Sequence, residues 1–167
     1  MNCVRLSPAT GSEDSGWYRD RIHNVDIAFV HGTMTEASFG HFLAEACRSI
    51  DECPDDGRVA MFLEVVEPAL MDSRWRKRLA QALKERAGKL ALTRPAYAMV
   101  TSSLVVRCAL KVMHWVAPPP YPNTVVGTAR EAFEFIAHHM PKLDAREIQL
   151  EYERRRADVL ARHPRTS

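Results

Sequence analysis

The sequence predicts an α/β fold, in which helices alternate with the strands of a mostly parallel sheet of four to five strands. Residues 59–66 form an almost continuous apolar run, which is typical of a strand covered on both faces of a parallel sheet. Between the predicted strands, apolar residues recur at helical spacing. Strands that alternate with helices in this way favour a parallel sheet with right-handed crossovers.

Length and composition indicate one globular domain. The chain has 167 residues, 46% of them hydrophobic and 26% charged, which is enough for one full core but not for two ordinary domains. The net charge of +2 gives no general attraction to nucleic acid or to a membrane. No apolar stretch approaches the length of a membrane span, and the four cysteines form no CxxC pair. We therefore expect a cytoplasmic protein with no integral membrane segment and no nucleic-acid partner.

The first elements are predicted to be an arm and a hairpin. Residues 1–16 are rich in Ser, Gly and Pro, and we expect a flexible N-terminal arm. Residues 17–23 alternate loosely between apolar and polar, and residues 27–30 are fully apolar. These two segments predict strands that pair through a turn at residues 24–26.

Two helices are expected on either side of the central strand. Thr33 with Glu36 three residues later is a capping-box pattern, and it precedes apolar residues spaced for an amphipathic helix. After the central strand, Ser73 opens a second helix, whose apolar stripe begins at Trp75. Gly88 is expected to end this second helix.

The rest of the α/β domain, which we place at residues 17–141, repeats this alternation. Residues 97–100 and 124–126 predict two further strands. Ser102 or Ser103 is positioned to cap the helix after the first of them, and Thr128 begins a second capping-box pattern.

Residues 142–167 predict a charged helix and tail, with Asp144 as the helix cap. The helix faces are mostly charged, and only a thin apolar line runs along them. Such a helix packs on the outside of a domain or meets a partner, so a homodimer formed through it is one interpretation.

Ser73 is the most distinctive candidate for a functional role. A phosphate or another small anion at this helix start would meet free backbone N–H groups and the positive end of the helix dipole. Arg74, Arg76 and Lys77 follow directly and would add positive charge. The ordinary alternative is a serine that only caps the helix.

The helix that follows Ser73 carries an unusual excess of positive charge. Between Arg74 and Lys89 there are seven basic residues and a single acidic one, Glu85. Such a face could bind an acidic protein partner or an anionic ligand, although solvated Lys and Arg are also common on exposed helices.

The motifs of common enzyme classes are missing from the sequence. It contains no GxGxxG, no GxxxxGK[ST], no nucleophile elbow and no HExxH pattern, and its seven histidines form no Cys/His cluster. We therefore expect a protein without catalytic residues, metal or cofactor.

A short motif links the central strand to Ser73. Residues 62–66 are mostly apolar, residues 67–71 form a short connection, and Asp72-Ser73 then begins a helix. This order resembles the STAS family, the sulfate transporter and anti-sigma factor antagonist domain, and in particular its sporulation-antagonist-like branch. The resemblance covers about residues 17–140. It implies a small α/β signalling domain with Ser73 as the phosphoacceptor and Asp72 as its neighbour.

The sequence thus predicts a non-catalytic signalling module that binds a protein partner, such as a regulatory kinase. Phosphorylation of Ser73 or an anion held near it would switch the module. The contacts would involve Asp72, Arg74, Arg76, Lys77, Ser102 and Ser103. The alternative is a protein that binds a small ligand (a lipid or an anion), or an enzyme, with its pocket at the C-terminal ends of the strands.

Overall fold

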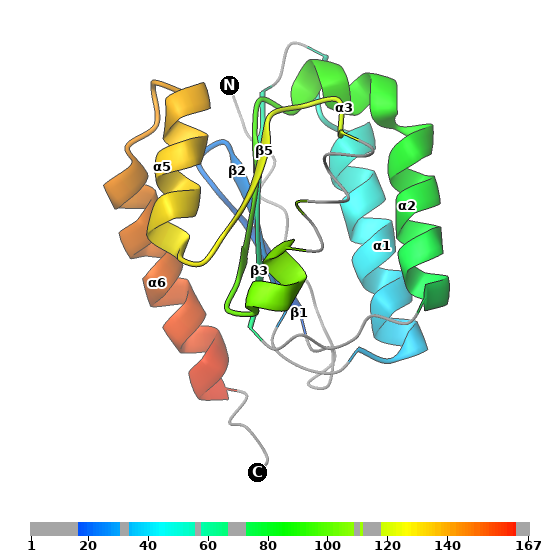
Figure 1. Ribbon diagram of the computed structural model, residues 1–167, viewed down its shortest axis with the longest axis horizontal. Coiled ribbons are helices and arrows are strands. Elements are labelled where there is room, and N and C mark those ends of the chain that lie inside the picture. Colours follow the sequence, from blue (N-terminus) through cyan, green and yellow to red (C-terminus); the bar gives the residue numbers. More distant parts are fainter. Residues whose placement is uncertain are drawn as a thin grey trace.

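A computed structural model confirms the α/β class (Figure 1). It describes residues 17–30, 34–55, 58–66, 73–108, 111 and 118–162. The strands are β1 (Trp17–Ile22), β2 (Val25–Val30), β3 (Ala60–Val65), β4 (Tyr97–Thr101) and β5 (Asn123–Val126). The helices are α1 (Glu36–Asp51), α2 (Ser73–Glu85), α3 (Ala87–Thr93), α5 (Ala129–His139) and α6 (Ala145–Arg162). Residues 104–108 are also helical. The expected arm at residues 1–16 lies outside the described residues.

The five strands lie in the sheet in the order in which they occur in the chain. β1 pairs with β2 in the antiparallel sense, and every later strand is parallel to the strand before it. Because the parallel crossovers are right-handed and all advance in one direction, their helices lie on the same face of the sheet. Figure 1 shows α1, α2 and α3 on that face and α5 and α6 on the other.

The predicted hairpin is present, but its turn is tighter than expected. Ile22 pairs with Val25, so that only His23 and Asn24 form the turn. His23 takes the left-handed backbone conformation with a φ of 50°, which lets two residues reverse the chain. The prediction of a turn at residues 24–26 is wrong, since Asp26 is a fully buried residue of β2.

The start of α1 also differs from the prediction. Thr35 is the N-cap, and its hydroxyl accepts a hydrogen bond from the Ser38 backbone N–H (3.1 Å). The Ser38 hydroxyl in turn accepts from the Thr35 N–H (2.8 Å). The capping box is therefore formed by Thr35 and Ser38, and the prediction that it begins at Thr33 is wrong.

The helices after β4 begin at the residues that the sequence predicts as caps. Thr128 caps α5 and completes a capping box with Glu131, as predicted. The Asp144 carboxylate accepts from two backbone N–H groups in the first turn of α6, and the Ser103 hydroxyl accepts from the Val106 N–H (3.3 Å). Local side-chain capping thus explains where these helices begin.

The helix after β3 is divided in two. α2 ends at Glu85, and Gly88 lies inside α3 rather than at a helix end, which corrects that prediction. α3 places Leu90 in the core with 3% of its surface exposed. By contrast, α2 has no fully buried residue, so the apolar stripe predicted for this helix is only partly buried.

The core on the α5 and α6 side is built around aromatic rings. Phe62 of β3 stacks on Phe133 of α5 with ring centroids 4.5 Å apart, and Tyr152 of α6 lies 4.7 Å from Phe62. Ile148 and Tyr152 of α6 are 1% and 2% exposed. The apolar line of the last helix is therefore packed against the sheet of this same chain.

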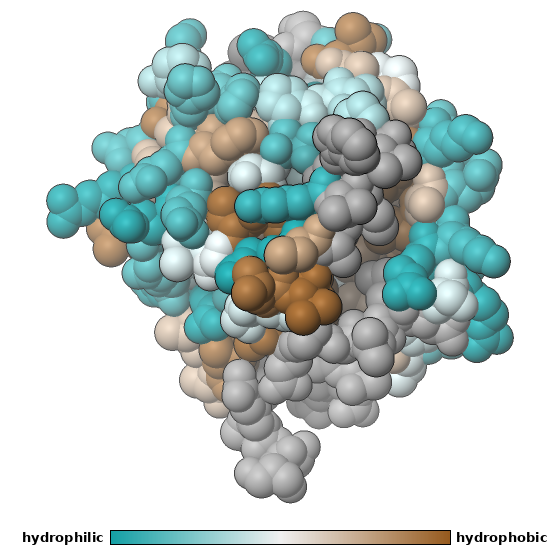
Figure 2. Space-filling model, viewed as in Figure 1, coloured by the Kyte–Doolittle hydropathy of each residue, from teal (hydrophilic) through white to brown (hydrophobic). Residues whose placement is uncertain are grey.

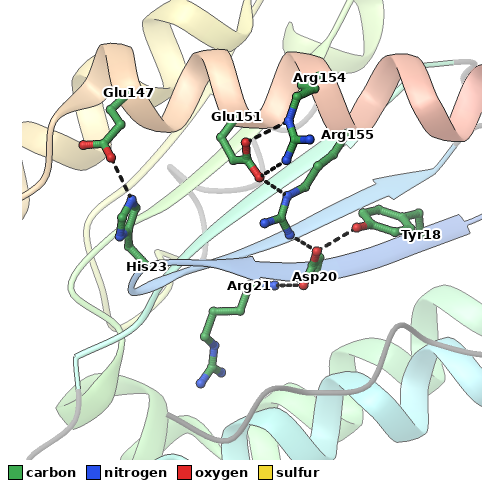
Figure 3. A network of polar contacts seen from close by, with 8 residues as sticks. All are labelled: Tyr18, Asp20, Arg21, His23, Glu147, Glu151, Arg154 and Arg155. Atoms are coloured by element: carbon green, nitrogen blue, oxygen red, sulfur yellow. Dashed lines mark hydrogen bonds and ion pairs between the residues drawn. The ribbon is translucent and has the colours of Figure 1, made fainter. Parts of the chain in front are cut away.

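Polar contacts also join α6 to the sheet. Asp20 of β1 accepts from the Tyr18 hydroxyl (2.8 Å) and pairs with Arg155. Arg155 and Arg154 are both held by Glu151 of the same helix (Figure 3). Further along α6, Tyr152 donates to Glu64 of β3, and Arg156 donates to the same carboxylate (2.9 Å). Glu64, the charged residue within the predicted central strand, is thus paired rather than exposed.

Candidate functional site

Ser73 lies where the sequence places it, at the first position of α2, and it is exposed. The side chains of Arg74, Arg76 and Lys77 are exposed along the first turns of the same helix. Asp72, the predicted neighbour, lies outside the described residues. The structure therefore brings one predicted serine together with the three predicted cations.

α2 is held against the start of α1 by one carboxylate. Glu36 accepts a hydrogen bond from the Trp75 indole N–H (2.6 Å) and pairs with Arg78. These hydrogen bonds, from Trp75 first and then from Arg78, lower the pKa of Glu36 below its usual value. The Trp75 ring also stacks on Phe39 of α1 with centroids 5.0 Å apart. Arg76 and Lys77 of the same helix are exposed and do not take part in this attachment.

The charge at the start of α2 is unbalanced. The first turn contains no acidic residue, although a helix N-terminus favours negative charge there by about 0.3–1 kcal/mol per group. Arg76 and Lys77 form no ion pair with any described residue. An acidic surface or a phosphate at this end would therefore meet both the helix dipole and unpaired cations.

Ser102 and Ser103 form a second group at the carboxyl end of β4. The Ser103 N–H donates to the Thr101 hydroxyl (3.4 Å), and Arg107 donates to the Thr101 carbonyl (3.1 Å). Within the described part of the chain, no hydrogen bond connects this group to Ser73. Ser73 and the Ser102–Ser103 pair thus follow two neighbouring parallel strands, β3 and β4, without a direct hydrogen bond between these described residues.

An apolar surface adjoins this second group. Leu104 and Val105 are 65% and 78% exposed. Figure 2 shows brown, apolar surface in the middle of the view, where Figure 1 has the short helix after β4, whereas the right edge over α2 is hydrophilic. The face that combines cations with Ser73 is therefore the one on α2.

The hollows of the molecule that we describe lie away from both serine groups. An open groove of about 490 Å³ runs between the β1–β2 turn and α6, lined by His23, Leu150 and charged side chains of α6. Two of its lining residues are in polar contact, since His23 Nε2 lies 3.5 Å from a Glu147 carboxylate oxygen (Figure 3).

A buried polar cluster lies on the opposite side of β1. Figure 3 shows the Arg21 side chain pointing away from α6, and its guanidinium donates to Asp26 (2.7 Å). Asp26 also accepts from Arg19 (2.9 Å) and from the Ser49 hydroxyl of α1 (2.6 Å). Burial tends to raise the pKa of Asp26, but the charge of Arg19 and the contacts with Arg21 and Ser49 together lower it. Asp26 is therefore a carboxylate that accepts hydrogen bonds from three side chains.

Arg94 adds a third guanidinium to this cluster. It follows α3, is 8% exposed, and interacts electrostatically with Asp26, Tyr121 and Arg19. Its side chain donates no hydrogen bond to any described residue, and its buried Nη1 lacks a partner. The Nε atom of Arg19 is likewise buried without a partner. Burial lowers the pKa of Arg94.

The buried positive charge of Arg94 is not balanced by the groups around it. Burying a charge without a partner costs several kcal/mol, even after the protein relaxes. The negative end of α1, beside Ser49 and Cys53, contributes at most about 2 kcal/mol to a nearby cation. Asp26 already pairs with Arg19 and Arg21. Together with Arg94, the cluster has three positive groups and one negative group, an excess of two positive charges.

This cluster was missed at the sequence level, although a signal was present. Arg19 and Arg21 are two residues apart in a strand that also carries the buried Trp17, so all three point to one face. Two arginines on a buried face require a carboxylate partner, and Asp26 was instead interpreted as a turn residue.

In the described ranges, none of the helices has the length and hydrophobicity needed to cross a bilayer. In the same ranges, no group of three or more His, Cys, Asp and Glu side chains is arranged to hold a metal ion. Comparison with protein-family models, with curated proteins and with solved structures found no match to this chain. The candidate sites therefore rest on the residues and geometry described above.

Proposed function

We propose that this chain is a non-catalytic, STAS-like signalling module that docks an acidic surface of a protein partner on α2. The observation that carries the proposal is the first part of α2, where Arg74, Arg76 and Lys77 are exposed and no acidic residue lies in the first turn. A surface with exposed cations at the positive end of a helix attracts an anionic partner.

Ser73 gives this surface a means of regulation. Its exposed hydroxyl lies at the start of the same helix, and a phosphate there would carry a charge of about −1.5 to −2 into the cationic surface. The phosphate would compete with the acidic partner for Arg76 and Lys77. Phosphorylation by a regulatory kinase would then weaken docking.

The order of the elements supports the STAS-like assignment within this proposal. The exposed serine begins the helix that follows β3, the middle strand of the sheet, and the sheet starts with a hairpin. A cytoplasmic location would give a kinase access to Ser73. A ligand pocket or an enzyme at the C-terminal strand ends stays the alternative; the groove that we describe lies elsewhere, between β1 and α6.

Charge reversal on α2 tests the docking surface. Full-length protein with Arg76→Glu and Lys77→Glu is compared with the wild type in pull-downs from its native host, and the captured partner is then titrated as a purified protein. We expect at least a tenfold weaker affinity, equivalent to about 1.4 kcal/mol. The matched control reverses two exposed charges on the other layer, Arg130→Glu and Arg146→Glu, and should bind normally. Equal affinity of both double variants would exclude α2 as the docking surface.

The switch is tested separately with Ser73→Asp and Ser73→Ala. The first should weaken partner binding, and the second should bind as the wild type but lose its response to kinase treatment. If neither substitution changes binding, the switch is excluded, while constitutive docking through α2 remains.

A further inference from the structure

Arg94 occupies a position that the protein alone does not explain. The side chain is 8% exposed, yet it makes no hydrogen bond to a described residue, and its Nη1 has no partner. Buried polar groups in folded proteins are almost always paired, and each exception indicates strain, a water or a bound ion. A guanidinium is a particularly demanding case because it keeps its charge and presents five N–H donors.

The nearest carboxylate is already engaged by other donors. Asp26 accepts from Arg19, Arg21 and Ser49 at 2.6 to 2.9 Å, and Arg94 donates no hydrogen bond to it. Arg19 makes the environment of Arg94 more positive and has an unpaired Nε of its own. Two buried guanidiniums therefore have donors left over at the same end of the sheet.

Two tyrosines complete the surroundings. The rings of Tyr97 and Tyr121 meet edge to face with centroids 6.2 Å apart, and both side chains are half-buried. The loop that carries Tyr121 is attached to the strand, since the Tyr97 N–H donates to the Pro122 carbonyl (2.9 Å). Burial raises the pKa of both phenols, so that they remain protonated and able to donate a hydrogen bond at neutral pH.

From this geometry we propose that Arg94, assisted by Arg19 and Tyr121, binds a small oxyanion group, a phosphate or a carboxylate, at the amino-terminal edge of the parallel strands. The flat guanidinium matches such groups because it can donate two parallel hydrogen bonds to them. The opening through which a ligand reaches the guanidinium is small, because Arg94 is only 8% exposed. The small exposed fraction selects a compact ligand.

This site is distinct from the docking surface on α2. Arg94 and Tyr121 lie beside the start of β4, whereas Ser73 and Arg76 belong to the helix that begins after the end of β3. The two proposals therefore succeed or fail independently.

Titration of the full-length protein with inorganic phosphate and, separately, with acetate tests the proposal. Ionic strength is held constant with chloride, and binding is followed by calorimetry and by the melting temperature. We expect saturable binding of one equivalent of at least one anion, with a melting temperature that rises with its concentration. Phosphate binding would identify a phosphate site, and binding of acetate alone would identify a carboxylate site.

Substitution connects the binding to Arg94. Arg94→Gln removes the charge and should weaken anion affinity at least tenfold, whereas Arg130→Gln, an exposed arginine on α5, should leave it unchanged. The Arg94 Nε–H resonance of the wild-type protein should also shift during the titration, which keeps the test valid if the variant folds poorly. Absence of saturable binding of both anions, or unchanged affinity in Arg94→Gln, would overturn the proposal.

Discussion

Asp26 shows how one carboxylate joins the hairpin to a helix. It is fully buried in β2 and holds Arg19 and Arg21 of β1 on one side and Ser49 of α1 on the other. Ion pairs of this kind contribute little net stability when complete, but removing one partner leaves buried charges without compensation. Substitution of Asp26 should therefore reduce the stability of the fold far more than substitution of a residue in a surface ion pair of the same length.

Asp26→Asn should destabilise the fold by about 3–5 kcal/mol, because it leaves the buried Arg19 and the partly buried Arg21 facing a neutral amide. Urea unfolding followed by circular dichroism measures this difference. As a control, Asp55→Asn removes a surface ion pair with Lys89 and should cost about 0–1 kcal/mol. Similar losses in the two variants would contradict the buried cluster.

The same comparison predicts a pH dependence. The pKa of Asp26 is lower in the folded protein than its ordinary value of 3.8, so the carboxylate stabilises the fold above that pH. This contribution is lost as the pH falls from about 3.8 through the folded pKa. We expect the difference in unfolding free energy between wild type and Asp26→Asn to be constant from pH 5 to 7 and to narrow below pH 3.8. A difference that does not change down to pH 2.5 would show that Asp26 does not titrate in this way.

At the scale of the element, sequence patterns located the strands and helices better than their ends. The apolar run of β3 and the helical spacing of α1 are strong signals, because burial on a sheet or helix requires them. Thr33 and Thr35 both lie three residues before a polar side chain, so the local pattern does not choose between them. A tertiary contact at the start of α1, the hydrogen bond from the Trp17 indole N–H to the Ser38 carbonyl (3.1 Å), accompanies the cap at Thr35.

Thr35→Ala should therefore reduce stability by about 1 kcal/mol through the loss of the cap of α1. Thr35→Ser keeps the hydroxyl and should retain most of that stability. Thermal and urea unfolding of the two variants measure the difference. Equal stability of the alanine and serine variants would mean that this hydroxyl does not cap the helix.

At the scale of the whole molecule, the feature that the sequence left most open is the attachment of α6. Its charged faces allowed packing on the outside of the domain or contact with a partner; Ile148 and Tyr152 are buried against the sheet, and Arg156 pairs with Glu64 of β3. The hydrogen bond from Tyr152 to Glu64 joins residues 88 positions apart, and the contact of Arg156 with Glu64 joins residues 92 positions apart. No local pattern reports such a pairing. The position of Arg94 in its cluster is likewise set by tertiary structure, since the members come from β1, β2, α1 and the end of α3.

Removal of α6 should therefore unfold the protein rather than only change its oligomeric state. A chain that ends at Pro141 exposes the Phe62–Phe133 stack and leaves Glu64 unpaired in the sheet. We expect loss of cooperative unfolding and of near-ultraviolet circular dichroism. Leu150→Ser, at an exposed position of the same helix, should change stability by less than about 0.5 kcal/mol. A truncated chain with wild-type stability would show that the helix is not part of the core.

The sequential order of the strands has a consequence for synthesis on the ribosome. Each strand pairs with the one made just before it, so the sheet can grow from β1 to β5 as the chain emerges. The ion pair between Asp20 and Arg155 is different, because its partners are 135 residues apart. The face of the sheet that carries Phe62 is covered only when α5 and α6, the last two helices, are made. A nascent or prematurely terminated chain would expose this apolar face, and exposed apolar surface is what chaperones and proteases recognise.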